Sequence, residues 1–114
     1  MSISNYEKFV TKISSGRICI GLVVTLNDMT VSELAGEVGY DFTWIDMEHA
    51  PLTMESAMQH VIAVKGTDCA PFVRVPWNKT EVIKTVLDLA PAAVIIPMVN
   101  TALEAEAAVK ACRY

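Results

Sequence analysis

Apolar residues follow two different spacings along this chain, and the two spacings alternate. Continuous apolar runs, which are typical of buried strands, occupy 18–24 (ICIGLVV), 42–46 (FTWID), 71–75 (PFVRV) and 92–97 (AAVIIP). Around these runs, apolar residues recur every three or four positions, as they do on one face of a helix. The pattern predicts a helix near residues 6–13 followed by four strand–helix units.

The predicted helices have recognisable starts and stops. Gly16, Gly39 and Gly66 end the first three, because glycine readily takes the left-handed conformation that follows many helices. Thr53 is a candidate N-cap for the third helix. Three further pairs can form capping boxes: Thr30 with Glu33, Asn78 with Glu81, and Thr101 with Glu104.

Strands that are apolar on both faces and alternate with helices indicate an α/β fold with a parallel sheet. In such a sheet the ligand site lies at the carboxyl ends of the strands, whether the sheet is open or closed into a barrel. The chain has 114 residues, and a complete (β/α)8 barrel needs about 250. No linker or charge run divides it, so we expect one domain or part of one.

The charge and the apolar content of the chain exclude some classes of binding partner. The net charge is −4 and the basic residues are scattered, so we expect binding neither to nucleic acid nor to an anionic membrane. No apolar stretch reaches the about 18 residues of a membrane span, and the N-terminus does not resemble a secretory leader. We therefore expect a cytoplasmic protein, in which Cys19, Cys69 and Cys112 are reduced thiols.

The second strand ends in an unusual concentration of ionisable groups, Asp46, Glu48 and His49. His49 is the candidate general base, because imidazole titrates near neutral pH and a neighbouring carboxylate can fix its tautomer. The alternative is a solvated acidic loop in which the histidine has no role. A zinc site is less favoured, because no second histidine or cysteine stands at ligand spacing.

Three further polar residues need an explanation. Arg74 lies inside an apolar strand, where a guanidinium needs an anion or an acceptor; a carboxylate substrate fits, and a core aspartate is the alternative. His60 shares the polar side of its helix with Gln59, so we expect it to be solvated. Asp88 ends a helix, where a negative charge opposes the helix dipole.

Taken together, four segments resemble the N-terminal half of the HpcH/HpaI aldolase family, the metal-dependent aldolases of 4-hydroxy-2-oxo acids. The segments are GYDFTWIDMEHAP (39–51), PFVRVPW (71–77), IKTVLDLAPAAVIIPMV (83–99) and AVKACRY (108–114). The resemblance implies that residues 1–114 are the N-terminal half of a single (β/α)8 TIM-barrel domain. It implies an enzyme that binds pyruvate on a divalent metal (Mg, Mn or Co) and makes or breaks a C–C bond through an enolate.

The resemblance also assigns roles to particular residues. His49 matches the catalytic base, Arg74 the group that holds pyruvate, Asp46 the acid beside the site, and Asp88 the partner that raises the basicity of the histidine. The family's metal ligands lie on later strands, beyond residue 114, so we expect none within this chain. Ala90 stands where the family usually has glycine, which puts the local turn in question.

The implied partners are a 2-oxo acid (pyruvate), an aldehyde and further copies of the same subunit, as a homo-oligomer. We expect the chain to be a fragment, because a half barrel leaves two strand edges unpaired. We expect it to be inactive alone, because the family's metal ligands lie beyond it. Alternatives are a citrate-lyase-type CoA-ester lyase, a non-catalytic oligomerisation module, and a half barrel that pairs with a second copy. An open flavodoxin-like sheet is disfavoured because the loop after the first strand has no glycine.

Overall fold

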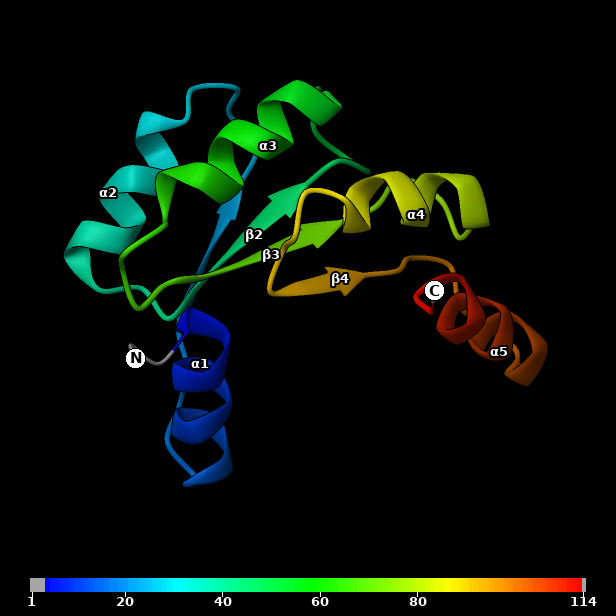
Figure 1. Cartoon of the computed structure of the whole chain (residues 1–114), viewed down its shortest axis with the longest axis horizontal. Coiled ribbons are helices and arrows are strands. Elements are labelled where there is room, and N and C mark those ends of the chain that lie inside the picture. The colour runs from blue at the N-terminus through cyan, green and yellow to red at the C-terminus, as the bar shows by residue number, and fades with distance from the viewer. Residues whose placement is uncertain (1–3, 114) are drawn as a thin grey trace.

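A computed structural model describes residues 4–113 and contains one parallel sheet with the strand order β1-β2-β3-β4. Strands and helices alternate after an initial helix, which confirms the predicted order (Figure 1). The strands are β1 (Gly21–Val24), β2 (Phe42–Asp46), β3 (Ala70–Arg74) and β4 (Ala93–Ile95). The helices are α1 (Asn5–Ser14), α2 (Thr30–Val38), α3 (Met54–Ala63), α4 (Thr80–Leu87) and α5 (Ala102–Ala111).

One face of the sheet, called here the covered face, packs against α2, α3 and α4 (Figure 1). Val24, Ile45 and Val73 stand side by side in the strand register and are each 0% exposed. Side chains alternate between the two faces of a strand, so their neighbours point the other way. On that second face, called here the open face, Val23 is 58% exposed.

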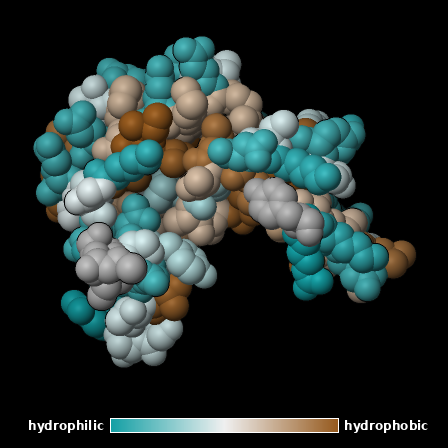
Figure 2. All heavy atoms as spheres, viewed as in Figure 1, coloured by the Kyte–Doolittle hydropathy of each residue, from teal (hydrophilic) through white to brown (hydrophobic). Residues whose placement is uncertain are grey.

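Helix α1 covers only the end of the open face where the strands begin. The ring of Phe9 meets Phe42 and Phe72 edge-on, with centroid distances of 5.7 and 5.0 Å. The same view as a space-filling picture shows a deep notch between α1 and α5, with apolar atoms at its inner end (Figure 2). The carboxyl ends of the strands therefore remain accessible from the open face.

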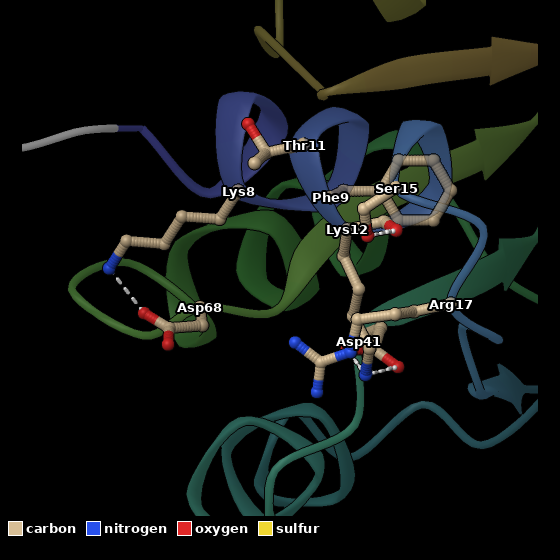
Figure 3. A pocket seen from close by; sticks show the side chains of 8 residues that line it. All are labelled: Lys8, Phe9, Thr11, Lys12, Ser15, Arg17, Asp41 and Asp68. Carbon is tan, nitrogen blue, oxygen red and sulfur yellow. Dashed lines mark hydrogen bonds and ion pairs between the residues drawn. The ribbon is translucent and has the colours of Figure 1, made fainter.

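Ion pairs fasten α1 to the amino-terminal end of the sheet, around a hollow of about 380 Å³ (Figure 3). Lys12 Nζ lies 2.7 and 2.8 Å from the two carboxylate oxygens of Asp41. Lys8 pairs with Asp68 in the loop before β3. Each carboxylate in this hollow is thus matched by a lysine, and the pairs join α1 to the loops before β2 and β3.

Two of the four predicted helix starts are confirmed and two are wrong. Thr53 accepts a hydrogen bond from the Ser56 backbone N–H, and Thr101 and Glu104 form a complete capping box. Thr30 does not cap α2, because Thr30 is itself the first helical residue. Asp28 Oδ1 accepts the Thr30 N–H at 2.9 Å instead. An aspartate two residues upstream is the better acceptor for that first free donor.

The predicted capping box of Asn78 with Glu81 is also wrong. Lys79 precedes α4, and no side chain caps this helix. The Asn78 Nδ2 group donates instead to the backbone carbonyl of Glu104, at 3.1 Å. A contact with α5, distant in the sequence, therefore replaces the local cap.

The three cysteines are free thiols, as predicted. Burial, and then the negative charge of Asp41, raise the pKa of Cys69 to about 11, so this thiol stays protonated and unreactive at neutral pH. Among residues 4–113, no helix is both long and apolar enough to cross a membrane.

Candidate active site

Asp46 and Arg74 are the last residues of β2 and β3, and the strand register places them side by side. Arg74 Nε donates to Asp46 Oδ1 at 3.1 Å, and Nη2 donates to Oδ2 at 2.5 Å. This two-bond geometry is the strong form of an arginine–carboxylate pair. The alternative considered for Arg74, a pair with a core aspartate, is therefore present in the structure.

Asp46 also organises the loop that carries the histidine. Its Oδ1 accepts the backbone N–H groups of Glu48 and His49, at 2.9 and 3.0 Å. Burial alone would raise the pKa of Asp46, but the hydrogen bonds from Arg74, His49 and Glu48 lower it to about 2. Asp46 is therefore an ionised anchor at neutral pH and has no proton to give.

Arg74 keeps donors available after this pairing. A guanidinium has five N–H donors, and the Asp46 pair occupies one on Nε and one on Nη2. Its Cζ atom lies 5.4 Å from the centroid of the Trp44 ring, on the open face. The hydrogen bond with Asp46 raises the pKa of Arg74 further, against the effect of burial. The group is a fixed cation that can still bind an anion.

Glu48 joins the histidine to the arginine. Its Oε1 lies 3.2 Å from His49 Nε2 and 3.4 Å from Arg74 Nη1. The His49 side chain is 72% exposed, whereas that of Glu48 is only 15% exposed. The sequence made Glu48 only one of two candidate partners for His49, and the structure makes it the shared carboxylate of the site. In the sequence, the position of Glu48 two residues after Asp46 and next to His49 indicated this role.

A hollow of about 380 Å³ opens beside these groups. It is lined by Glu48, His49, Pro76, Trp77 and Met98, so two polar side chains face an apolar wall. Met98 has φ 59°, in the left-handed region that non-glycine residues rarely adopt. Such strained positions concentrate at functional sites.

Asp88 lies at the other end of the sheet. It is the C-terminal cap of α4 and leads into the loop before β4 (Figure 1), whereas His49 follows the end of β2. The structure therefore does not bring Asp88 and His49 together within this chain. The role that the resemblance assigns to Asp88 stays a prediction. Ala90, which follows closely, has φ 56°, so an alanine makes the left-handed turn where glycine was expected.

The prediction that His60 is solvated is wrong, because its side chain is 0% exposed. Its Nδ1 lies 2.7 Å from Ser32 Oγ on α2, and its Nε2 lies 2.9 Å from the Leu26 carbonyl oxygen. The polar side of an isolated helix became an interior surface when α2 packed against α3. Burial lowers the pKa of His60, against the Leu26 hydrogen bond and the charge of Asp28.

The described residues do not by themselves fit a divalent metal. Within residues 4–113, no three His, Cys, Asp or Glu side chains are grouped as metal ligands. Asp46 already binds Arg74 with both oxygens, and Glu48 is shared between Arg74 and His49. Both carboxylates near the site are thus committed to cationic or N–H partners.

Comparisons with known proteins show which family the chain resembles. The chain is 37% identical over 106 residues to the hydroxypyruvate/pyruvate aldolase of Roseobacter denitrificans, covering 93% of this chain and 41% of that protein. It is 39% identical over 112 residues to the 4-hydroxy-2-oxovalerate aldolase of Rhodococcus jostii, covering 97% and 43%. The chain thus spans about two fifths of the length of these curated relatives.

A solved structure shares the fold. An HpcH/HpaI aldolase/citrate lyase family protein from Burkholderia cenocepacia superposes with a TM-score of 0.87 at 27% identity, over 97% of this chain and 44% of that one. The four βα units are thus of the (β/α)8 barrel type. A sequence model of one family, described as HpcH/HpaI aldolase/citrate lyase, matches residues 19–114. The chain belongs to the HpcH/HpaI aldolase/citrate lyase family.

Proposed function

We propose that residues 1–114 are the N-terminal half of a single (β/α)8 domain of a class II aldolase. The complete enzyme would cleave the C3–C4 bond of a 4-hydroxy-2-oxo acid to give pyruvate and an aldehyde, or form that bond from them. One observation carries the proposal: a single carboxylate oxygen of Glu48 lies within 3.4 Å of both a histidine and an arginine at the carboxyl ends of the strands. The names of the aldolase relatives support the same reaction.

His49 would act as the base through Nδ1. A carboxylate only accepts hydrogen bonds, so the contact with Glu48 favours the tautomer that carries its hydrogen on Nε2. That tautomer leaves the lone pair on Nδ1, and the negative charge of Glu48 stabilises the imidazolium that forms. In this proposal Glu48 supports His49 within the chain, and the role that the resemblance assigns to Asp88 stays a prediction.

In the cleavage direction, His49 takes the proton of the C4 hydroxyl and the C3–C4 bond breaks. C4 leaves as the aldehyde carbonyl, and the bonding electrons pass through C3 to the C2 oxygen, forming the enolate of pyruvate. The remaining donors of Arg74 hold the substrate carboxylate and stabilise the developing negative charge. A proton added at C3 then completes pyruvate, and the synthetic direction reverses these steps.

A divalent metal (Mg, Mn or Co) belongs to the proposal, with ligands outside residues 4–113. When bound, such an ion polarises the 2-oxo group as a Lewis acid. The family resemblance, and not the described residues, supports this part. The same resemblance supports a homo-oligomer, and a cytoplasmic location is part of the proposal.

The apolar wall beside His49 is the proposed contact for the aldehyde part of the substrate. Trp77 is 60% exposed and Met98 is 64% exposed, and both line the hollow that contains His49. Exposed apolar side chains gathered around a hollow are typical of ligand sites. The carbon chain of the aldehyde would lie against them.

The test compares the 114-residue chain with a version extended by its downstream coding sequence. We expect the extended protein, with Mn²⁺, to exchange the C3 protons of pyruvate and to cleave a 4-hydroxy-2-oxo acid, and the shorter chain to do neither. His49→Ala should reduce cleavage by at least ~100-fold, the usual scale for the loss of a general base. Unchanged turnover would remove His49 from the mechanism, and no activity in either version would favour a non-catalytic module.

A further inference from the structure

We propose that His60 is a positioning residue that clamps the loop between β1 and α2 (25–29) onto α3, beside the candidate active site. Two side chains of α3, with their partners called here the polar clamp, make this connection: His60 contacts the Leu26 carbonyl of the loop and Ser32 at the start of α2, and Ser56 contacts Asn27. The loop leaves the carboxyl end of β1, which neighbours β2 and its His49 loop in the sheet. The clamp therefore acts at the same end of the sheet as His49, Glu48 and Arg74.

The first arm of the clamp has a defined direction of hydrogen bonding. The Leu26 carbonyl can only accept, so His60 Nε2 carries the hydrogen and donates it over 2.9 Å. Burial lowers the pKa of His60 and so favours the neutral ring, in which Nδ1 carries the lone pair and accepts the Ser32 hydroxyl over 2.7 Å. His60 and Ser32 are both 0% exposed, so water does not compete for these bonds.

The second arm reaches the start of α3. The Ser56 hydroxyl donates to Asn27 Oδ1, and Ser56 is 5% exposed. Thr53 Oγ1 lies 3.0 Å from Ser56 Oγ and caps α3 by accepting the Ser56 backbone N–H. Thr53 stands four positions after His49 in the sequence. The loop after β1 and the segment after His49 are thus fastened to the same helical turn.

Apolar packing contributes little to this loop, in which only Met29, next to α2, is partly buried. Thr25, Leu26, Asn27 and Asp28 are all exposed, and even the Leu26 side chain is 60% exposed. The position of the loop therefore depends on its polar contacts, of which the Leu26 carbonyl has the most deeply buried partner. An apolar residue at position 60 would fill the interior equally well but could not bind that carbonyl. The hydrogen bond to the loop therefore explains why a histidine, and not an apolar residue, stands at position 60.

Two substitutions at position 60 separate the two bonds of the ring. The amide nitrogen of His60→Gln can take the place of Nε2 and still donate to Leu26, whereas the shorter His60→Asn reaches only Ser32. We expect amide hydrogen exchange in residues 25–29 to accelerate at least about tenfold in His60→Asn and less than about threefold in His60→Gln. Exchange within α3 reports whether each variant is folded. Equal exchange of the loop in both variants and the unsubstituted chain would overturn the clamp.

A surface variant tests the second arm without disturbing the interior. Asn27→Ala removes the acceptor of Ser56 at an exposed position, and we expect exchange in residues 25–29 to rise about threefold. Glu37→Ala, on the exposed side of α2, is the matched control and should leave this segment unchanged. If Asn27→Ala and Glu37→Ala behave alike, Ser56 does not hold the loop.

The effect on catalysis rests on the proposed function and is measured in the extended protein. A loop that shapes the site without touching the reacting atoms should alter KM more than kcat. We expect His60→Asn to raise the KM for a 4-hydroxy-2-oxo acid about fivefold, with kcat and pyruvate proton exchange within about twofold. A loss confined to kcat would overturn the positioning role. An inactive unsubstituted enzyme would instead reject the proposed function, and the exchange experiment would still decide the clamp.

Discussion

The covered and open faces of the sheet use the same strands for different purposes. Val24 on the covered face is 0% exposed, whereas its chain neighbour Val23 on the open face is 58% exposed. The paired Asp46 and Arg74 lie at the carboxyl ends of the strands, and Arg74 stacks over Trp44 on the open face. The covered face thus supplies the hydrophobic core, and the open face supplies the polar chemistry. Residues of the hydrophobic core and residues of the candidate site can therefore be substituted separately in this chain.

Val24→Ala and Val23→Ala form a matched pair that tests this separation directly. Removing buried methyl groups from Val24 costs their transfer free energy and leaves a cavity, so we expect a loss of about 2 kcal/mol in the free energy of unfolding. Val23→Ala should change it by less than about 0.5 kcal/mol. Urea denaturation followed by circular dichroism gives both values. Equal losses would mean that the open face is also packed in solution.

The Asp46–Arg74 pair should make a pH-dependent contribution to stability. The pKa of Asp46, about 2 in the folded protein, lies below its ordinary value of 3.8. The stabilisation is therefore fully present above pH 3.8 and is lost as the pH falls from 3.8 towards 2, in total about 2 kcal/mol. Urea midpoints measured between pH 5 and pH 2 should show this loss in the unsubstituted chain and a smaller one in Asp46→Asn. Parallel pH profiles would contradict the pairing.

Trp77→Ala tests whether an exposed apolar residue near the open face serves binding. We expect it to raise the KM for a 4-hydroxy-2-oxo acid with an apolar tail about tenfold in the extended protein, equivalent to about 1.4 kcal/mol. Pyruvate proton exchange and the urea midpoint should stay unchanged, because Trp77 contacts neither pyruvate nor the core in this proposal. Met58→Ala, an exposed residue on α3, is the control. Loss of stability in Trp77→Ala alone would make Trp77 part of the packing instead.

Ala90→Gly is expected to have the smallest effect and should increase stability. Ala90 has φ 56°, which a side chain disfavours and glycine accepts without strain. Relief of this strain exceeds the entropy cost of glycine by about 0.5 kcal/mol, so the thermal midpoint should rise by a few degrees. Gly39→Ala, at φ 95°, is the opposite substitution and should lower it. A lower midpoint for Ala90→Gly would show that this turn is not strained in solution.

Features that depend on neighbours in the sequence were predicted well. The strand 42–46 was predicted with its observed limits, and the Thr101 and Glu104 capping box forms as expected. One capping prediction failed because a nearby aspartate is the better acceptor, and another because a distant group binds the capping side chain. Asn78 was expected to cap α4, but the Glu104 carbonyl of α5 takes its amide hydrogen. A capping pair is therefore a reliable prediction only where no other part of the fold binds the capping side chain.

The candidate site likewise has features that the sequence predicted and features that only the fold revealed. His49, Arg74 and Asp46 were identified from residue type and place in the chain, because ionisable groups at strand ends are unusual among apolar runs. The pairing of Arg74 with Asp46 and the sharing of Glu48 required the strand register, which aligns residues 28 positions apart. Asp88 was assigned by resemblance, and the fold places it at the other end of the sheet.

The order of helices and strands and the identity of the reactive groups follow from the amino-acid order alone, because spacing and residue type are local properties of a chain. Which distant polar groups meet depends instead on how the helices and strands pack together. His60 shows the reason: the side of a helix that is polar becomes interior when a second helix packs on it, and burial then selects the hydrogen bonds that remain. The same packing that formed the covered face left the open face free for Arg74, Glu48 and His49.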